Sequence, residues 1–433
     1  MVGALVVLAS GCGGSSDEHR TLTVVVNAPF SRTPYVGETI ARGAELAAQE
    51  VRAAGGIVTD DGTFDLRIAR ADNALSPQRA VANVRDAKDV RPRLRIDQAR
   101  ASLVRDRQRD LRITGEHPRC IHAGALVDDR HGVDASWMLA RDAEVPLAIT
   151  YQGGAGLVDP ETRPNVFRVA PTDRGISFRL AEYLVPKGLR IAIVTDDSGY
   201  GREGKAALAK AFGSNPEAVA LRAEVPAGSG GVSTAVLRAR RAGATALLVW
   251  GQARTLAAAI TASRSRGWQV PVYAPPSAED PLLRQQLADH PEWVDGLTFA
   301  SGRMTAERGP EDWMRFQTAF ENAFGADLVG VRTSSGAPVA QPPDYAMYAY
   351  DFVRVLAAAI DRADGVDDRE AVLRALDEVT VRGANGDERG FNVHNHEGVV
   401  DDDVYFARFD DMTFRPVADD ALSSTLPVID QTR

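Results

Sequence analysis

The sequence lacks several features that define other classes of protein. It has two cysteines in 433 residues, too few for a disulfide scaffold. No apolar run reaches the ~18 residues of a membrane-spanning helix, which argues against an integral membrane protein. Basic residues are outnumbered by acidic ones, and the net charge of −9 argues against nucleic acid as the main partner, because phosphate binding requires surplus Lys and Arg.

Motifs that carry chemistry are also missing. No G-x-G-x-x-G follows the first predicted strand, no G-x-S-x-G is present, and no nucleophile is evidently paired with a base. The glycine-rich run 227–231 has no G-K-[ST] after it, so it is not a phosphate loop. His394 and His396 have metal-like spacing, but no further His or Cys lies near them. We therefore expect no enzyme activity, no cofactor and no metal.

The first twenty residues resemble a bacterial lipoprotein signal. Met1–Gly11 are mostly apolar, and small residues immediately precede Cys12, as in a lipobox whose cysteine becomes the lipidated N-terminus. A Gly/Ser-rich tether follows. The alternative is a frayed hydrophobic N-terminus, and no Lys or Arg precedes the apolar run. We predict that residues 1–20 are signal and tether, and that Cys120 has no disulfide partner.

From Leu22 onward, short apolar runs alternate with amphipathic helical stretches. This alternation predicts parallel sheets with right-handed crossovers, and the length of the chain predicts two lobes. The predicted strands are 21–26, 63–69, 120–126, 145–150, 190–195, 218–225, 244–250, 270–274 and 296–300. The predicted helices are 38–54, 76–86, 135–143, 175–185, 201–212, 233–242, 255–266, 310–324 and 346–363, and a hairpin-like tail spans 389–416.

One segment does not follow this pattern. Residues 91–119 carry nine arginines and have weak periodicity. We expect a mostly exposed helix or loop there.

Five strings of the chain are GETIARGAELAAQEVRAAGGI, VPLAITYQGGAGLVDPETRPNVFRVAPTDRG, LRIAIVTDDSGYGREG, ATALLVWGQARTLAAAITASRSRGW and DYAMYAYDFVRVLAAAI. These strings resemble the branched-chain amino-acid type of ABC-transporter substrate-binding lipoprotein, including the leucine-binding proteins. They occur in the order of the family and cover most of the chain, and residues 91–119 interrupt the match.

This resemblance implies a type I periplasmic-binding fold, in which three hinge crossings join two doubly wound parallel-sheet lobes. We expect lobe one at 21–170 with 302–385 and lobe two at 171–301 with 386–433. Ligands of such sheets bind beyond the carboxyl ends of the strands, which selects the loops after 126, 150, 195, 250 and 274.

The resemblance also implies a set of ligand-binding residues in these loops. In the family, the first group offers backbone N–H groups to a ligand carboxylate, an acid at the first crossing faces the ligand ammonium, and a tyrosine covers apolar groups. The candidates are Gln152, Gly153, Gly154, Asp173, Tyr200, Trp250, Gln252, Ser277 and Glu279.

Two of these candidates have plain structural alternatives. Asp173 could cap the helix that begins near Gly175, and Trp250 could be a core side chain, since the side chains of a strand alternate between faces.

A departure from the family lies in the loop after 274. Amino-acid binders carry a glutamate at the position aligned with Pro276, where it holds the α-ammonium, and here the nearest acids are Glu279 and Asp280. Either the loop is rearranged or the ligand has no α-amino group.

The sequence therefore predicts a monomeric solute-binding lipoprotein at the cell surface or in the periplasm. Its expected partners are a small organic solute such as an amino acid, an ABC permease, and the lipid on Cys12. The alternatives are a ligand-sensing receptor that signals to a membrane partner and a degenerate member that binds nothing.

Overall fold

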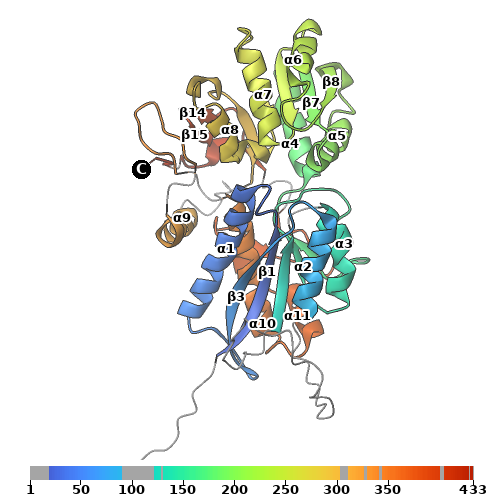
Figure 1. Ribbon diagram of the computed structural model, residues 1–433, viewed down its shortest axis with the longest axis vertical. Coiled ribbons are helices and arrows are strands. Elements are labelled where there is room, and N and C mark those ends of the chain that lie inside the picture. Colours follow the sequence, from blue (N-terminus) through green and yellow to red (C-terminus); the bar gives the residue numbers. More distant parts are fainter. Residues whose placement is uncertain are drawn as a thin grey trace, which may run out of the picture.

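The computed structural model contains two α/β lobes, which lie one above the other in Figure 1. It describes residues 19–89, 121–127, 130–302, 311–325, 329–340, 344–399, 404–428 and 430–432. The predictions for Cys12, for the arginine-rich segment 91–119 and for Cys120 fall outside these ranges.

The first lobe is built on a six-stranded sheet in the order β2-β3-β1-β4-β5-β6. Neighbouring strands are parallel except for the pair β2 and β3. The strands are β1 (Arg20–Ala28), β2 (Ile57–Thr59), β3 (Gly62–Asp72), β4 (Ile121–Val127), β5 (Leu147–Ile149) and β6 (Val166–Arg168). The helices are α1 (Pro34–Ala53), α2 (Pro77–Asp89), α3 (Arg130–Arg141), α9 (Glu311–Phe324), α10 (Asp344–Arg362) and α11 (Arg369–Leu376).

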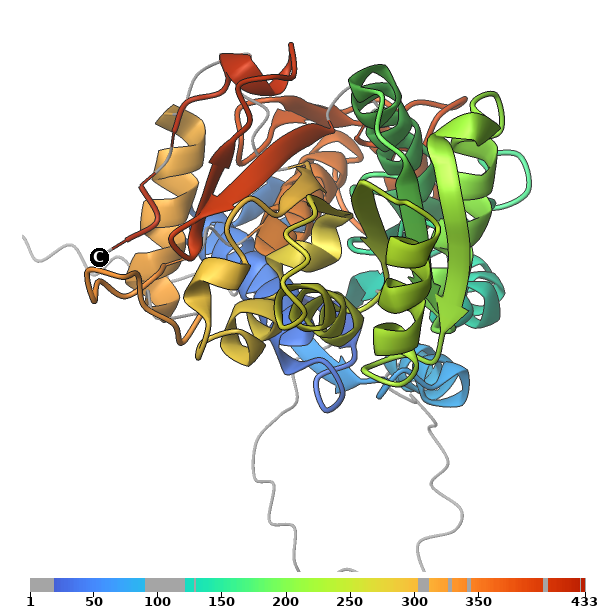
Figure 2. The same ribbon diagram turned by 90° about the horizontal axis from the view of Figure 1, so that it is seen from above.

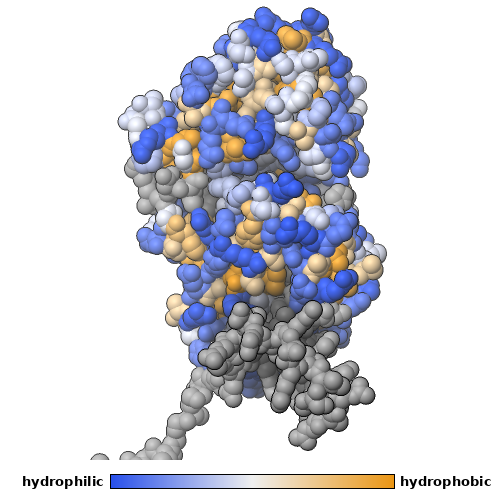
Figure 3. Space-filling view, in the orientation of Figure 1, coloured by the Kyte–Doolittle hydropathy of each residue, from blue (hydrophilic) through white to orange (hydrophobic). Residues whose placement is uncertain are grey.

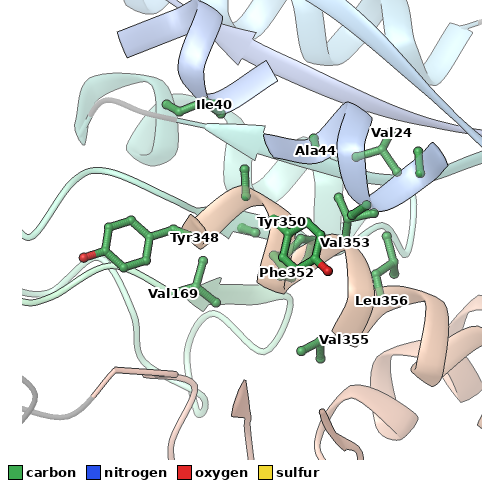
Figure 4. Close-up of a cluster of buried hydrophobic side chains, with 14 of the residues drawn as sticks. Val24, Ile40, Ala44, Val169, Tyr348, Tyr350, Phe352, Val353, Val355 and Leu356 are labelled. Carbon is green, nitrogen blue, oxygen red and sulfur yellow. The ribbon is translucent and has the colours of Figure 1, made fainter. Parts of the chain in front are cut away.

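Helix α10 forms the centre of the first-lobe core. Apolar residues recur along it at helical spacing, and they are buried together with Val24 of β1 and Ile40 and Ala44 of α1, as Figure 4 shows. A small hairpin of β12 (Thr380–Arg382) and β13 (Glu388–Gly390) packs against the same helix. Burial of this apolar face explains why the family-like string at 344–360 folds as one long helix.

The second lobe is built on a seven-stranded sheet in the order β15-β14-β11-β10-β9-β7-β8, of which β14 and β15 are antiparallel. In Figure 2 these C-terminal strands (red) lie on the other side of the lobe from β8 (green). The strands are β7 (Ile191–Asp196), β8 (Val219–Val225), β9 (Ala246–Trp250), β10 (Val272–Ala274), β11 (Thr298–Ser301), β14 (Tyr405–Asp410) and β15 (Thr413–Pro416). The helices are α4 (Asp173–Leu184), α5 (Gly199–Ala211), α6 (Val232–Arg241), α7 (Ala253–Arg264) and α8 (Pro281–Gln286).

The chain passes from the first lobe to the second between β6 and α4, returns between β11 and α9, and passes again after Val399. Val399 belongs to the first-lobe core and Val404 to the second-lobe core. The boundary expected at 386 falls inside the β12–β13 hairpin, so the last passage comes later than the sequence suggests. In addition, residues 329–340 make an excursion onto the second-lobe core through Val329, Val331 and Val339.

Every predicted strand overlaps an observed one, and every predicted helix overlaps an observed helix. The helices and strands that the sequence pattern did not reveal are short: β2, β6, β12, α8 and α11. About two turns of a helix, or three residues of a strand, leave too little periodicity to detect.

Candidate functional site

A cleft of about 1010 Å³ lies between the two lobes. Its walls come from the loops that follow β1, β3 and β5 in the first lobe and β7, β9 and β10 in the second. These strands run parallel within each sheet, so their carboxyl ends share one edge, and the two edges face each other across the cleft. The outer face in Figure 3 is mostly hydrophilic, with hydrophobic side chains scattered over it.

Four of the nine candidate residues line this cleft: Gln152, Tyr200, Gln252 and Ser277. Of the five loops selected from the sequence, those after 150, 195, 250 and 274 contribute to its walls. The loops after β1 and β3 also contribute, and the sequence reasoning missed them. Their residues resemble ordinary turns, and only the register of the sheet places them at the cleft.

Hydrogen bonds within the loop after β5, and from β6 and α4, hold that loop in place. The Gly154 N–H donates to the Gln152 side-chain carbonyl at 3.1 Å, and Arg168 donates to the Gly154 carbonyl at 3.0 Å. The Asp173 N–H donates to the Gly153 carbonyl at 2.8 Å. A Cβ on Gly153 would lie 2.5 Å from the Asp173 carboxylate, so glycine is required there for a close approach.

Asp173 is the first residue of α4 and is buried, with 4% of its surface exposed. The capping role expected as its structural alternative is wrong, because Thr172 is the N-cap and its hydroxyl accepts the Gly175 N–H at 2.9 Å. Asp173 lies at the crossing between the lobes, against Gly153 and close to the wall that carries Tyr200.

Tyr200 and Trp250 form two layers of the second-lobe wall. Tyr200 lines the cleft, and its ring centroid lies 5.7 Å from that of Trp250, which is fully buried in the core. A Cβ on Gly204 would lie 2.1 Å from the Trp250 indole nitrogen, so α5 sits directly on this ring. Trp250 is therefore a core residue behind the wall, as its structural alternative predicted.

The Tyr200 phenol stays protonated at neutral pH. Burial, followed by the negative charge of Asp173 and the proximity of Tyr151, raises the pKa of Tyr200 well above its ordinary value, and the Ser277 hydroxyl opposes that rise. The phenol is thus a neutral hydrogen-bonding group that faces the first lobe.

The loop after β10 is rearranged relative to the expectation. Ser277 lines the cleft, whereas Glu279 is 1% exposed and is absent from the lining. The acid of this loop that lines the cleft is Asp280, which caps α8 by accepting the Leu282 N–H at 2.9 Å. The proline-rich run of this segment sets the geometry, since 276–279 form a 3₁₀ turn that carries Glu279 away from the cleft.

Sequence reasoning missed Asp196, the last residue of β7. Its buried carboxylate accepts the Gln252 N–H and the Thr255 hydroxyl, each at 2.8 Å, together with the N–H and hydroxyl of Ser198. One carboxylate therefore holds together the two loops that present Tyr200 and Gln252. An aspartate at the end of a strand gives no signal of this role, because Gln252 in the second loop lies 56 residues away in sequence.

Sequence reasoning also missed an aromatic cluster on the first-lobe wall. Tyr35 of α1 and Tyr151 line the cleft, and both pack edge-on against Tyr345 of α10, with ring centroids 6.1 and 4.7 Å apart. The Tyr345 hydroxyl donates to the Pro276 carbonyl at 3.2 Å, which links this cluster to the second lobe. The three tyrosines are far apart in sequence, so only the fold brings them together.

Of the two spaced histidines, His396 has a structural role at the first-lobe sheet edge, whereas His394 is exposed. His396 is buried, its Nδ1 lies 3.0 Å from the Val166 carbonyl, and its ring stacks on Phe167. Its Nε2 lies 2.9 Å from the Asp377 carboxylate. Among the residues that the structure describes, no group of three or more potential ligands could hold a metal ion.

Across the same described ranges, no helix combines the length and the apolar character that spanning a membrane would require.

Comparison with known proteins agrees with this architecture. A family model described as periplasmic binding protein matches residues 133–413. A search of curated proteins finds no match. Among solved structures, a periplasmic binding protein type 1 from Bordetella pertussis Tohama I is 19% identical, with a TM-score of 0.73 over 92% of this chain and 100% of that one.

Two further solved structures are similar. The leucine-binding protein LivK from Thermotoga maritima MSB8 is 16% identical, with a TM-score of 0.68 over 92% of this chain and 98% of that chain. A solute-binding protein of an ABC transporter from Rhodopseudomonas palustris BisB5, in complex with 3,4-dihydroxybenzoic acid, is 15% identical. Its TM-score is 0.66 over 95% of this chain and 98% of that chain.

These likenesses confirm the type I periplasmic-binding fold expected from the sequence strings. Together with the match of the family model to more than half of the chain, they show that this chain belongs to the periplasmic binding protein family.

Proposed function

We propose that the protein is an extracytoplasmic solute-binding lipoprotein that captures a small organic solute and delivers it to an ABC permease. The observation that carries this proposal is the cleft of about 1010 Å³ whose walls are supplied by strand-end loops of both lobes. A ligand held by one wall would gain contacts from the other when the lobes close, so binding would favour the closed form that a permease recognises.

The proposed first contacts are Gln152 on the first lobe and Tyr200, Gln252 and Ser277 on the second. Asp173 lies behind this lining at the crossing, and we propose that its carboxylate favours a cationic group of the solute near the hinge and repels an anionic one, so that an anion is held elsewhere in the cleft. Gly153 and Gly154 shape the first wall, while Trp250 and Glu279 support the second from within.

Relatives of similar fold support a small organic cargo. LivK is named as a leucine-binding protein, and the Rhodopseudomonas palustris protein holds 3,4-dihydroxybenzoic acid. One fold thus accommodates an aliphatic amino acid and an aromatic acid, so the side chains of the cleft and not the fold decide the ligand.

Thermal unfolding against a panel of solutes tests the binding function. We would use the full-length Cys12→Ala chain with amino acids, amides, amines, and aliphatic and aromatic carboxylates. A ligand at a hundred times its dissociation constant stabilises the folded state by ~2.7 kcal/mol, which raises the midpoint visibly. The Tyr200→Ala variant should lose the shift, whereas Trp293→Ala, which lies outside the cleft lining, should keep it. A cooperative transition that no compound moves would contradict the proposal.

Membrane fractionation tests the anchor separately. In a bacterial host, the unmodified chain should sediment with membranes, and Cys12→Ala should release it into the soluble fraction. Membrane association that survives this substitution would overturn the lipid anchor and leave the binding function untouched.

A further inference from the structure

The charged side chains that line the cleft differ in whether they have a partner within the protein. The four cationic ones are Arg32, Arg42, Arg202 and Arg254, and the four anionic ones are Glu38, Asp197, Glu203 and Asp280. The numbers of positive and negative side chains are equal. The preference for a ligand therefore depends on which of these side chains already have a hydrogen-bond or ion-pair partner in the protein.

Each acidic side chain has a partner within the protein, which is cationic for Glu38 and a backbone N–H for Asp197 and Asp280. Glu38 pairs with Arg70 at 2.8 Å and lies 3.9 Å from Arg42, and Asp197 accepts the Ala227 N–H at 2.8 Å. Asp280 caps α8, and Glu203 makes an interaction of its own.

Two arginines are not satisfied. Arg42 has Glu38, and Arg202 donates to the Asp197 carbonyl. Within the ranges of the chain that the structure describes, the guanidinium groups of Arg32 on the first lobe and Arg254 on the second make no hydrogen bond, ion pair or ring contact. Both side chains are exposed and line the cleft. Each lobe therefore presents to the cleft one guanidinium group that is available to a ligand anion.

The loop after β5 is poorly suited to hold an anion. Its Gly154 N–H is occupied by the Gln152 side chain. In addition, the Glu203 carboxylate lies 3.5 Å from the position that a Cβ on Gly154 would take, so a ligand carboxylate placed against this glycine would meet a like charge. An acidic group of the ligand fits better at Arg32 and Arg254.

The remaining lining suits a flat apolar body. Tyr35, Tyr151 and Tyr200 are half-buried, so part of each ring is available from the cleft. Leu75 and Leu282 add apolar surface, and 45% of Leu75 is exposed. Aromatic rings pack edge-to-face or offset against tyrosine, which gives a planar ligand contact on more than one side.

We infer that the cleft selects an aromatic carboxylate without an amino group, with its carboxylate paired to Arg254 and Arg32 and its ring packed against the tyrosine walls. This inference rests on the proposed solute-binding function and specifies the class of solute. It also gives a physical reading of Pro276, since a ligand without an α-ammonium needs no glutamate in the loop after β10.

Titration calorimetry with matched ring compounds tests the inference. The full-length Cys12→Ala chain would be titrated at pH 7 with benzoate, 4-hydroxybenzoate and phenylacetate. Benzamide and benzylamine keep the ring and replace the anion by a neutral and a cationic group, cyclohexanecarboxylate keeps the anion without the aromatic ring, and L-leucine represents amino acids. We expect at least one aromatic carboxylate to bind at least tenfold more tightly than the amide, the amine and leucine.

Two variants locate the anion. Arg254→Gln and Arg32→Gln should each weaken binding of the best aromatic carboxylate about tenfold, and the loss should be smaller at high salt because the contact is exposed. Arg238→Gln is the matched control: an exposed arginine on α6 outside the cleft lining, whose loss should leave affinity unchanged.

The outcomes separate this inference from the function on which it rests. Binding of leucine or benzylamine with no binding of any aromatic carboxylate would overturn the inference and support the solute-binding function. Tight carboxylate binding that neither arginine variant weakens would overturn the placement of the anion. A thermally cooperative protein that binds nothing, here or in the wider panel, would overturn both.

Discussion

The two edges that face each other across the cleft are held in shape by different chemistry. On the second lobe, the single carboxylate of Asp196 accepts hydrogen bonds from both cleft loops. On the first lobe, neutral amides do the same work: Asn73 donates to the Asn27 carbonyl at 3.1 Å, and Asn83 donates to the Asn27 side-chain oxygen at 2.8 Å. Asn27 in turn donates to the Ala80 carbonyl at 3.0 Å.

This difference follows from what each group can do. An ionised carboxylate only accepts, so it gathers several donors at one point and makes stronger bonds with them. An amide both donates and accepts, so it forms chains in which each member carries one or two bonds. The second-lobe edge therefore depends on the one carboxylate of Asp196, whereas the first-lobe edge is held by the side chains of three residues, Asn27, Asn73 and Asn83.

Asp196→Ala should give the largest effect. It leaves the Gln252 N–H and its neighbouring donors without their buried acceptor, and we expect a loss of about 3 kcal/mol in the free energy of unfolding. Denaturant titration followed by circular dichroism measures it. The control Asp197→Ala removes one exposed contact, to Ala227, and should cost less than 1 kcal/mol. Equal losses in the two variants would show that the second-lobe edge does not depend on this carboxylate.

Asn73→Ala should have a smaller effect, because fewer bonds are lost. Asn73 is fully buried, and its side chain also accepts the Leu75 N–H at 2.9 Å, which helps to hold Ala74 and Leu75 at φ of 49° and 58°. We expect a loss of about 2 kcal/mol, measured by the same titration. The half-buried Asn83→Ala should cost about 1 kcal/mol. A loss for Asn73→Ala as large as that for Asp196→Ala would break the contrast between the edges.

Tyr345→Phe tests the contact that joins the two edges. The substitution removes one hydrogen bond to the Pro276 carbonyl and keeps the ring, so the closed form should lose about 1 kcal/mol relative to the open form. Affinity for a bound solute should fall about fivefold. Tyr350→Phe, whose hydroxyl bonds Glu50 within the first lobe, is the control and should leave affinity unchanged. Parallel losses in both variants would mean that the hydroxyl does not couple the lobes.

The smallest expected effect is on the free energy of unfolding in acid, and it appears only at low pH. Burial opposes ionisation of Asp420, but its bonds to Ser423 and its pairing with Arg179 prevail and lower its pKa below the ordinary value. A lowered pKa in the folded state means that its stabilisation is complete above about pH 4 and is lost as pH falls through the folded-state value. Acid titration of Arg179→Gln should show a weaker loss of stability below pH 4 than the unmodified protein. Superimposable acid profiles would contradict this.

Much of the fold was predictable, because long amphipathic helices and runs of apolar strand residues carry their own periodicity. The helix at 38–54 and the strand at 190–195 are examples. The position of the cleft was also predictable, because it lies at the carboxyl ends of the parallel strands. The side chains that line or support it were less predictable: Asp196 and Tyr345 act through partners distant in sequence, and Glu279 is turned inward by neighbouring prolines. Such roles depend on tertiary contacts that no local pattern encodes.

Because Tyr200 lies over Trp250, the tryptophan fluorescence of the protein should respond to events in the cleft. Within the described part of the chain the Trp250 indole N–H has no hydrogen-bond partner, and the ring is fully enclosed, so its emission should lie at the short-wavelength end of the tryptophan range. A solute that displaces Tyr200 would alter the environment of this one indole at close range. The other four tryptophans contribute a background emission. Occupancy of the cleft could then be followed as the change in intrinsic fluorescence on addition of solute, without a label and at concentrations too low for calorimetry.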